Sequence, residues 1–170
     1  MFFFSSVASI AEVAITGGTA KATTYYDSTW LPINAFTLGH KHGWHIAEPY
    51  GMLPQMIWYE FPAGKTFVPA RVSFHPGCGC NQDCCPERGP SVWQFVGSND
   101  STCGKYGNWT VLCEDLSNAA FPDKYAIKFC HVDDKILSEF RCLGISVLRT
   151  RANNGAASLK NVRMWKKVFA

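Results

Sequence analysis

Aromatic, acidic and amide side chains gather in three stretches of the sequence, residues 23–34, 38–54 and 75–90, which lack the pattern of a strand. Proteins bind sugars with an aromatic ring against the apolar C–H face and with fixed polar groups that take the hydroxyls. For Trp30 and Trp44, a place in a lid over the hydrophobic core is an equally good interpretation. The side chains that could make such sugar contacts are Tyr26, Trp30, Trp44, His45, Asn81, Gln82 and Arg88.

The same stretches contain oxygen ligands that suit calcium, which takes six to eight oxygens from carboxylates, amides and carbonyls. The candidate metal ligands are Asp27, Glu48, Asp83 and Glu87. Each acid could instead be a solvated loop residue, because the sequence has no linear calcium motif. The spacing of His40, His42 and His45 resembles a transition-metal cluster, but we favour histidines that form ordinary hydrogen bonds.

The eight cysteines predict disulfides and an oxidising compartment, so we expect a secreted protein. Four of them cluster within residues 78–85, where a zinc thiolate site is the alternative to disulfides. Among the others, we expect Cys103 to pair with Cys113, and Cys130 with Cys142. Two glycosylation sequons, residues 99–101 and 108–110, agree with secretion.

Composition excludes several classes of function. The net charge of +3 is too small to predict nucleic-acid binding, and no apolar run approaches the roughly 18 residues of a membrane-spanning helix. The sequence contains no nucleophile elbow, metalloprotease helix or phosphate-binding glycine loop. The acid pairs at 114–115 and 133–134 are interpreted as solvated turn residues, so we expect no enzymatic activity.

Short β-branched and aromatic runs, separated by Gly, Pro, Asn and Asp, predict about eight strands and an all-β fold. In residues 125–129 the side chains alternate: Tyr125, Ile127 and Phe129 share one face, and we expect one face to be buried and the other wet. No linker or repeat divides the chain, so residues 1–170 are predicted to form one domain. The runs are 13–15, 55–61, 70–74, 92–96, 109–112, 125–129, 140–148 and 158–165.

Three segments carry a family resemblance: residues 91–100 (SVWQFVGSND) with 108–112 (NWTVL), 140–147 (FRCLGISV), and 157–165 (ASLKNVRMW). Their order and spacing resemble the discoidin, or coagulation-factor type C, domain. The resemblance implies a disulfide-containing jelly-roll β-sandwich. It also implies that the three long stretches project from one end, and that the Ser-Asn-Asp turn at 98–100 lies at the other.

The resemblance further implies a lectin for galactose or terminal galactosides, to which the loop acids add calcium at the sugar site. The alternative is an adhesion module that binds phosphatidylserine membranes or extracellular matrix through its loop tips, because clotting-factor relatives insert loop aromatics into such membranes. Anionic lipids require Lys and Arg, whereas these loops carry four acids against Lys41 and Arg88, so we favour a glycan. Weak single sites require avidity, and we therefore expect a homodimer.

Overall fold

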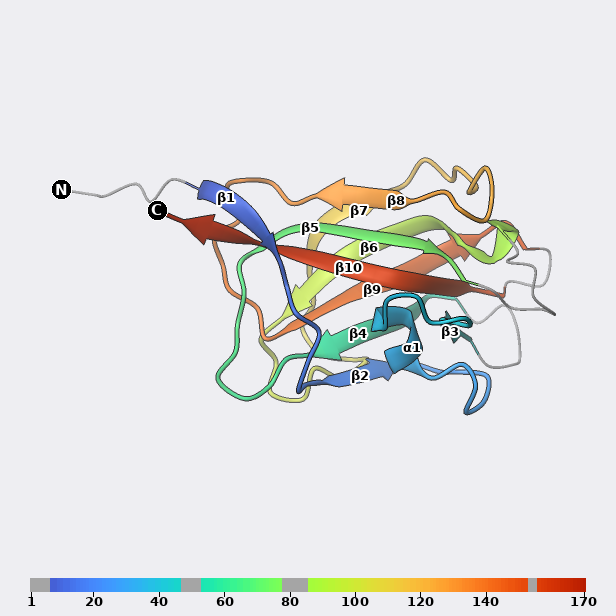
Figure 1. Cartoon of the computed structure of the whole chain (residues 1–170), viewed down its shortest axis with the longest axis horizontal. Helices are drawn as coiled ribbons and strands as arrows, with labels where there is room; N and C mark the ends of the chain where they lie inside the picture. The colour runs from blue at the N-terminus through green and yellow to red at the C-terminus, as the bar shows by residue number, and fades with distance from the viewer. Residues whose placement is uncertain (1–6, 47–52, 78–85, 153–155) are drawn as a thin grey trace.

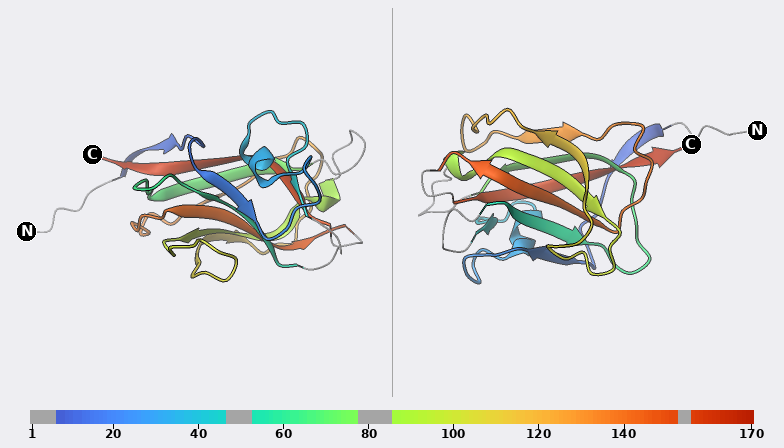
Figure 2. Two further views of the ribbon diagram at one scale, coloured as in Figure 1. Left: turned by 90° about the horizontal axis from the view of Figure 1, so that it is seen from below. Right: turned by 180° about the vertical axis from the view of Figure 1, so that it is seen from behind.

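A computed structural model of the chain describes residues 7–46, 53–77, 86–152 and 156–170. In these residues ten strands form two antiparallel sheets that stack as two layers (Figures 1 and 2). None of the described helices has the length and hydrophobicity that crossing a membrane requires. The elements are β1 (Val7–Glu12), β2 (Thr19–Ala22), α1 (Pro32–Phe36), β3 (Trp44–His45), β4 (Gln55–Glu60), β5 (Pro69–Pro76), a 3-10 helix (Pro86–Arg88), β6 (Pro90–Ser98), β7 (Thr110–Asp115), β8 (Lys128–His131), β9 (Cys142–Thr150) and β10 (Ser158–Phe169).

The first sheet has the order β1-β10-β5-β8, with β3 also beside β10, and the second has the order β2-β4-β9-β6-β7. Their inner faces form one aromatic-rich core. Phe74 of β5 meets Trp93 of β6 edge-to-face across the two layers, with ring centroids 4.7 Å apart, and both side chains are fully buried. The predicted all-β sandwich is confirmed.

The predicted runs match the central strands and miss the short marginal ones. Runs 55–61, 70–74, 92–96, 140–148 and 158–165 fall on β4, β5, β6, β9 and β10. The run 13–15 is wrong as a strand, because it lies between β1 and β2. The strands β1, β2 and β3 were not predicted. These strands lie at a sheet edge or are very short, so their sequences carry little of the alternating apolar pattern that identifies a strand.

Residues 125–129, which lead into β8, turn their larger apolar side chains to solvent. Tyr125, Ile127 and Phe129 are 75%, 54% and 59% exposed. The intervening Lys128 turns inward instead, where its ammonium donates to Ala119 O at 2.5 Å and meets Asp115 of β7 at 3.3 Å. The alternation was right. One face is buried more than the other, as expected, but the larger apolar residues lie on the exposed one, because Lys128 turns toward Asp115 of the other sheet.

The predicted disulfide pairing is wrong. Cys103 pairs with Cys142, and Cys113 pairs with Cys130. The loop after β6 folds back over the outer face of the second sheet, which brings Cys103 above β9. Cys113 lies opposite the buried Phe95 and so faces the other sheet, where it links the edge strands β7 and β8. The spacing of the cysteines along the chain could not show that Cys103 lies over the outer face of the second sheet while Cys113 faces the first sheet.

Peptide mapping of the non-reduced protein should recover Cys103–Cys142 and Cys113–Cys130. Replacing Cys103 and Cys142 together by Ala should lower the free energy of unfolding by about 2–4 kcal/mol, because the open loop gains conformational freedom in the unfolded chain. Urea unfolding measures this change. Recovery of a Cys103–Cys113 peptide would contradict the observed arrangement.

Candidate functional site

The predicted loops come together at one end of the sandwich. The backbone N–H of Tyr26, in the first loop, donates to His45 O in the second at 3.0 Å. The side chain of Arg88, from the third, reaches the ring of His45. The turn at 98–101 lies at the opposite end, beyond the tip of β6 (Figure 1). The placement implied by the resemblance is confirmed for the described residues.

Local features hold His45 in place. Gly43 has a φ of +85°, and a Cβ on it would lie 2.6 Å from Leu159 O. A glycine there therefore allows β3 to pair closely with β10, with His45 opposite Ser158. Arg88 ends a 3-10 helix that is attached to the end of β9, because Arg151 N donates to Glu87 O at 2.9 Å.

His45 and Arg88 form a hydrogen-bonded pair with defined polarity. Arg88 Nη1 lies 3.1 Å from His45 Nε2, and His45 Nδ1 lies 2.8 Å from Ile46 O. Because guanidinium only donates and carbonyl only accepts, Nδ1 carries the proton and the imidazole is neutral. Burial lowers the pKa of His45, and the Arg88 charge lowers it further. The guanidinium is thereby oriented at the loop end.

Aromatic rings surround this pair. Tyr26 is 49% exposed and meets His45 edge-on at 5.8 Å between centroids. Trp30 is partly exposed and lies 5.6 Å from His45 and 4.8 Å from His42. The loop that carries Trp30 is fixed by α1, where Phe36 packs on Tyr59. The two accessible rings can stack on a sugar ring, and the charged pair between them can donate hydrogen bonds to the sugar hydroxyls.

Trp44 is not a ligand contact. Its side chain is completely buried, and its indole N–H donates to Thr24 O at 2.7 Å. The strand β3 turns Trp44 into the core and presents the neighbouring His45 to the loops. The lid interpretation is therefore correct for Trp44, while Trp30 remains at the surface.

His42 was not among the predicted binding residues, yet it packs on Trp30. Its backbone N–H donates to His40 Nδ1 at 3.3 Å, which shapes this part of the second loop. The signal in the sequence is the close spacing of the three histidines, which also resembles a transition-metal cluster. Of the other predicted residues, Asn81, Gln82, Glu48 and Asp83 lie outside the described residues, as does the cysteine cluster.

Two of the predicted calcium ligands, Asp27 and Glu87, lie among the residues that the structure describes, and both are exposed. Asp27 also builds its own loop: Oδ1 accepts from Thr29 N at 2.7 Å and the carbonyl accepts from Trp30 N at 3.0 Å. Within the described ranges, the one group of three close metal-type ligands is Glu60, Cys103 and Cys142. Its two sulfurs form a disulfide, so this group is no metal site.

Acidification should lower the stability of the folded protein. The pKa values of His42, His45 and His75 are all lowered, in each case chiefly by burial. Below about pH 6.5 the unfolded chain takes up protons that the folded chain resists, so the free energy of unfolding should fall. Urea midpoints on either side of that pH measure the change, and His45→Gln should reduce the difference. A midpoint that rises on acidification would contradict the prediction.

No family model matches the sequence, and no curated protein matches it. Solved structures do match. The family 32 CBM of Clostridium perfringens NanJ, in complex with galactose, is 16% identical with a TM-score of 0.64, covering 92% of this chain and 99% of that chain. CpGH89CBM32-5 of the same organism, in complex with GalNAc-beta-1,3-galactose, is 17% identical with a TM-score of 0.67, covering 91% and 99%.

An F5/8 type C domain from Bacteroides fragilis is 6% identical with a TM-score of 0.67, and covers 94% of this chain and 98% of that chain. These likenesses concern the fold alone. The chain therefore has the discoidin-type β-sandwich fold.

Proposed function

We propose that this protein is a lectin that binds a sugar at the loop end and carries out no chemistry on it. The single observation that carries the proposal is the His45–Arg88 pair flanked by Tyr26 and Trp30. The rings offer stacking surfaces, and the guanidinium offers donors in a fixed orientation. Two structures with the same fold were solved with galactose or a galactose-containing disaccharide.

Galactose or a terminal galactoside is the proposed ligand. Its axial hydroxyl leaves one face of the ring apolar for an aromatic side chain and sets neighbouring hydroxyls toward one side, where a guanidinium can donate to both. Calcium is proposed at the same loop end of the sandwich. Its proposed ligands are the carboxylates of Asp27 and Glu87, which lie among the described residues, together with those of Glu48 and Asp83. We also propose that the protein is extracellular and dimeric, because paired weak sites bind multivalent surfaces more tightly.

A glycan array, run with calcium and again with a chelator, tests the proposal. We expect signal on terminal galactosides that falls when calcium is removed. Sedimentation with phosphatidylserine liposomes is measured in parallel. Liposome binding without any glycan signal would contradict the lectin proposal and favour a membrane adhesion module. Glycan binding that the chelator does not change would remove calcium from the site. Light scattering at the same concentrations reports the dimer.

Paired tyrosine variants place the site. Tyr26→Ala should weaken binding roughly tenfold, since an aromatic stacking contact contributes about 1 kcal/mol or more. Tyr106→Ala is the control, because Tyr106 is 91% exposed in the loop at the far end. Titration calorimetry with the best glycan of the array compares the two. Equal affinities would move the site away from the first loop.

A further inference from the structure

Two glycosylation triplets lie on the loop between β6 and β7, at the end of the sandwich opposite the proposed sugar site (Figure 1). They are Asn99-Asp100-Ser101 and Asn108-Trp109-Thr110. The side-chain surroundings of the two asparagines differ. A glycan can remain on a folded domain only where the asparagine amide can point into solvent without breaking contacts that the fold requires.

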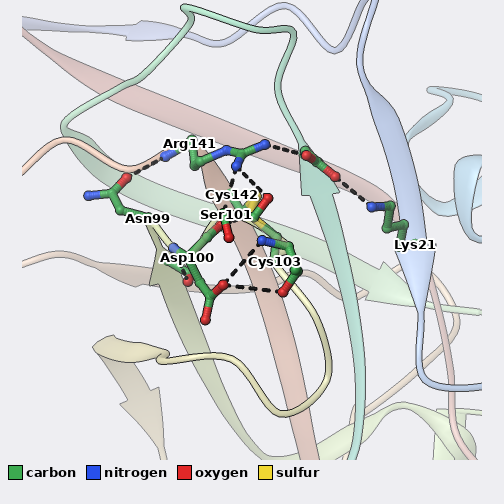
Figure 3. Close-up of polar contacts among 10 residues, drawn as sticks. Lys21, Asn99, Asp100, Ser101, Cys103, Arg141 and Cys142 are labelled. Atoms are coloured by element: carbon green, nitrogen blue, oxygen red, sulfur yellow. Dashed lines mark hydrogen bonds and ion pairs between the residues drawn. A yellow bond between two sulfur atoms is a disulfide. The ribbon is translucent and has the colours of Figure 1, made fainter.

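The amide of Asn99 is used by the fold on both sides. Its Nδ2 donates to Glu139 O at 2.6 Å. Its Oδ1 accepts from Arg141 N at 2.9 Å, as Figure 3 shows. Arg141 in turn donates to Ser101 O at 2.7 Å and pairs with Glu60. Asn99 is exposed, but a sugar on Nδ2 would replace one amide hydrogen at the nitrogen that donates to Glu139 O. Asn99 therefore holds two loops together at this end.

Asn108 is bonded through its backbone instead. Its carbonyl accepts from Ser98 Oγ at 2.7 Å, and its N–H approaches Asp100 Oδ2 at 3.4 Å. Its side chain is exposed, and no hydrogen bond joins that amide to any part of the chain that the structure describes. The backbone is fixed while the acceptor nitrogen is accessible.

The next two residues complete the triplet in a favourable arrangement. Trp109 turns inward, where it packs against Trp58 at 6.0 Å between ring centroids and donates to Gly104 O at 3.0 Å. Thr110 begins β7 and is exposed again. Asn108 and Thr110 are therefore both exposed, on either side of the partly buried Trp109.

We infer that Asn108 carries an N-linked glycan and that Asn99 does not. The inference rests on the proposed extracellular location and not on sugar binding. The donor is an oligosaccharide on a lipid pyrophosphate. Asn108 Nδ2 forms a bond to the anomeric carbon, the bond from that carbon to the phosphate oxygen breaks, one amide proton is released and the lipid pyrophosphate leaves.

A glycan at this position also covers an open sheet edge. The strand β7 is the last strand of its sheet, and Thr110 and Val111 are exposed beside Asn108. Unpaired edges template association between chains unless something blocks them. The glycan would stand over this edge while leaving the loop end free.

Secretion of the full chain from a eukaryotic host, directed there by an added leader, tests the inference. Peptide-N-glycosidase converts a glycosylated Asn to Asp, and mass spectrometry then identifies the position. Thr110→Val removes the second triplet and keeps a β-branched residue; Ser101→Ala removes the first and keeps the carbonyl that Arg141 uses. We expect one glycan in the wild type and in Ser101→Ala, and none in Thr110→Val.

Two further outcomes are informative. Asn99→Gln should keep the glycan and lower the melting temperature, because the bonds to Glu139 O and Arg141 N are disturbed. Secreted protein that is converted to Asp at position 99, or that carries no glycan at all, would overturn the inference. Glycan-array binding is measured on the same samples, so a failure of the lectin proposal is seen separately.

Discussion

Arg88→Ala should weaken glycan binding by roughly tenfold to a hundredfold, since a hydrogen bond from a charged donor contributes about 1.5–3 kcal/mol. The loss has two sources. The guanidinium donors disappear, and the Nε2 acceptor of His45 is left without its observed partner. Titration calorimetry with a galactoside measures the change.

Two comparison variants separate recognition from general charge. Arg88→Lys should recover part of the affinity, because an ammonium keeps the charge and one donor but not the planar fork. Arg149→Ala should bind as the wild type does, since Arg149 is an exposed arginine on β9. If Arg149→Ala lost as much affinity as Arg88→Ala, binding would depend on net charge and not on the site.

Trp44→Ala should lower the free energy of unfolding by about 3–5 kcal/mol, the usual cost of emptying a fully buried aromatic position. The deletion also leaves Thr24 O without the indole donor. Urea unfolding measures the change. Trp44→Phe should cost less and should bind glycan normally.

Trp30→Ala should have the opposite effects to Trp44→Ala. We expect it to lose glycan affinity with little change in stability, because Trp30 is partly exposed and packs mainly on His42 and His45. The two tryptophans thus form a direct comparison of core and site. A Trp44→Phe protein that is stable but does not bind glycan would restore Trp44 as a ligand contact.

The central strands and the family segments were predictable because they are long and buried on a regular pattern. The run at 92–96 lies in β6, an interior strand of its sheet, where Trp93 and Phe95 face the core. Sequence alternation could not tell which face of β8 is inside. That choice depends on the contact between Lys128 and Asp115, residues on different strands of different sheets.

The site was predictable as a place and less so as a set of side chains. The long loops identified Tyr26, Trp30, His45 and Arg88, which the fold brings together. The sequence could not separate the adjacent Trp44 and His45, because a two-residue strand carries too little pattern to show which side chain enters the core. Pairings across the sandwich, as in the disulfides, depend on how the loop after β6 folds back.

The pairing of Val7 with Phe169 sets where the described chain enters and leaves the domain. Both strand ends lie at the same pole of the sandwich, away from the loops that carry His45 and Arg88 (Figure 1). A tether fused to either strand end would leave the loops that carry His45 and Arg88 facing outward. Such a domain can be displayed on a bead, a particle or a larger polypeptide from either strand end without obstructing the proposed sugar site.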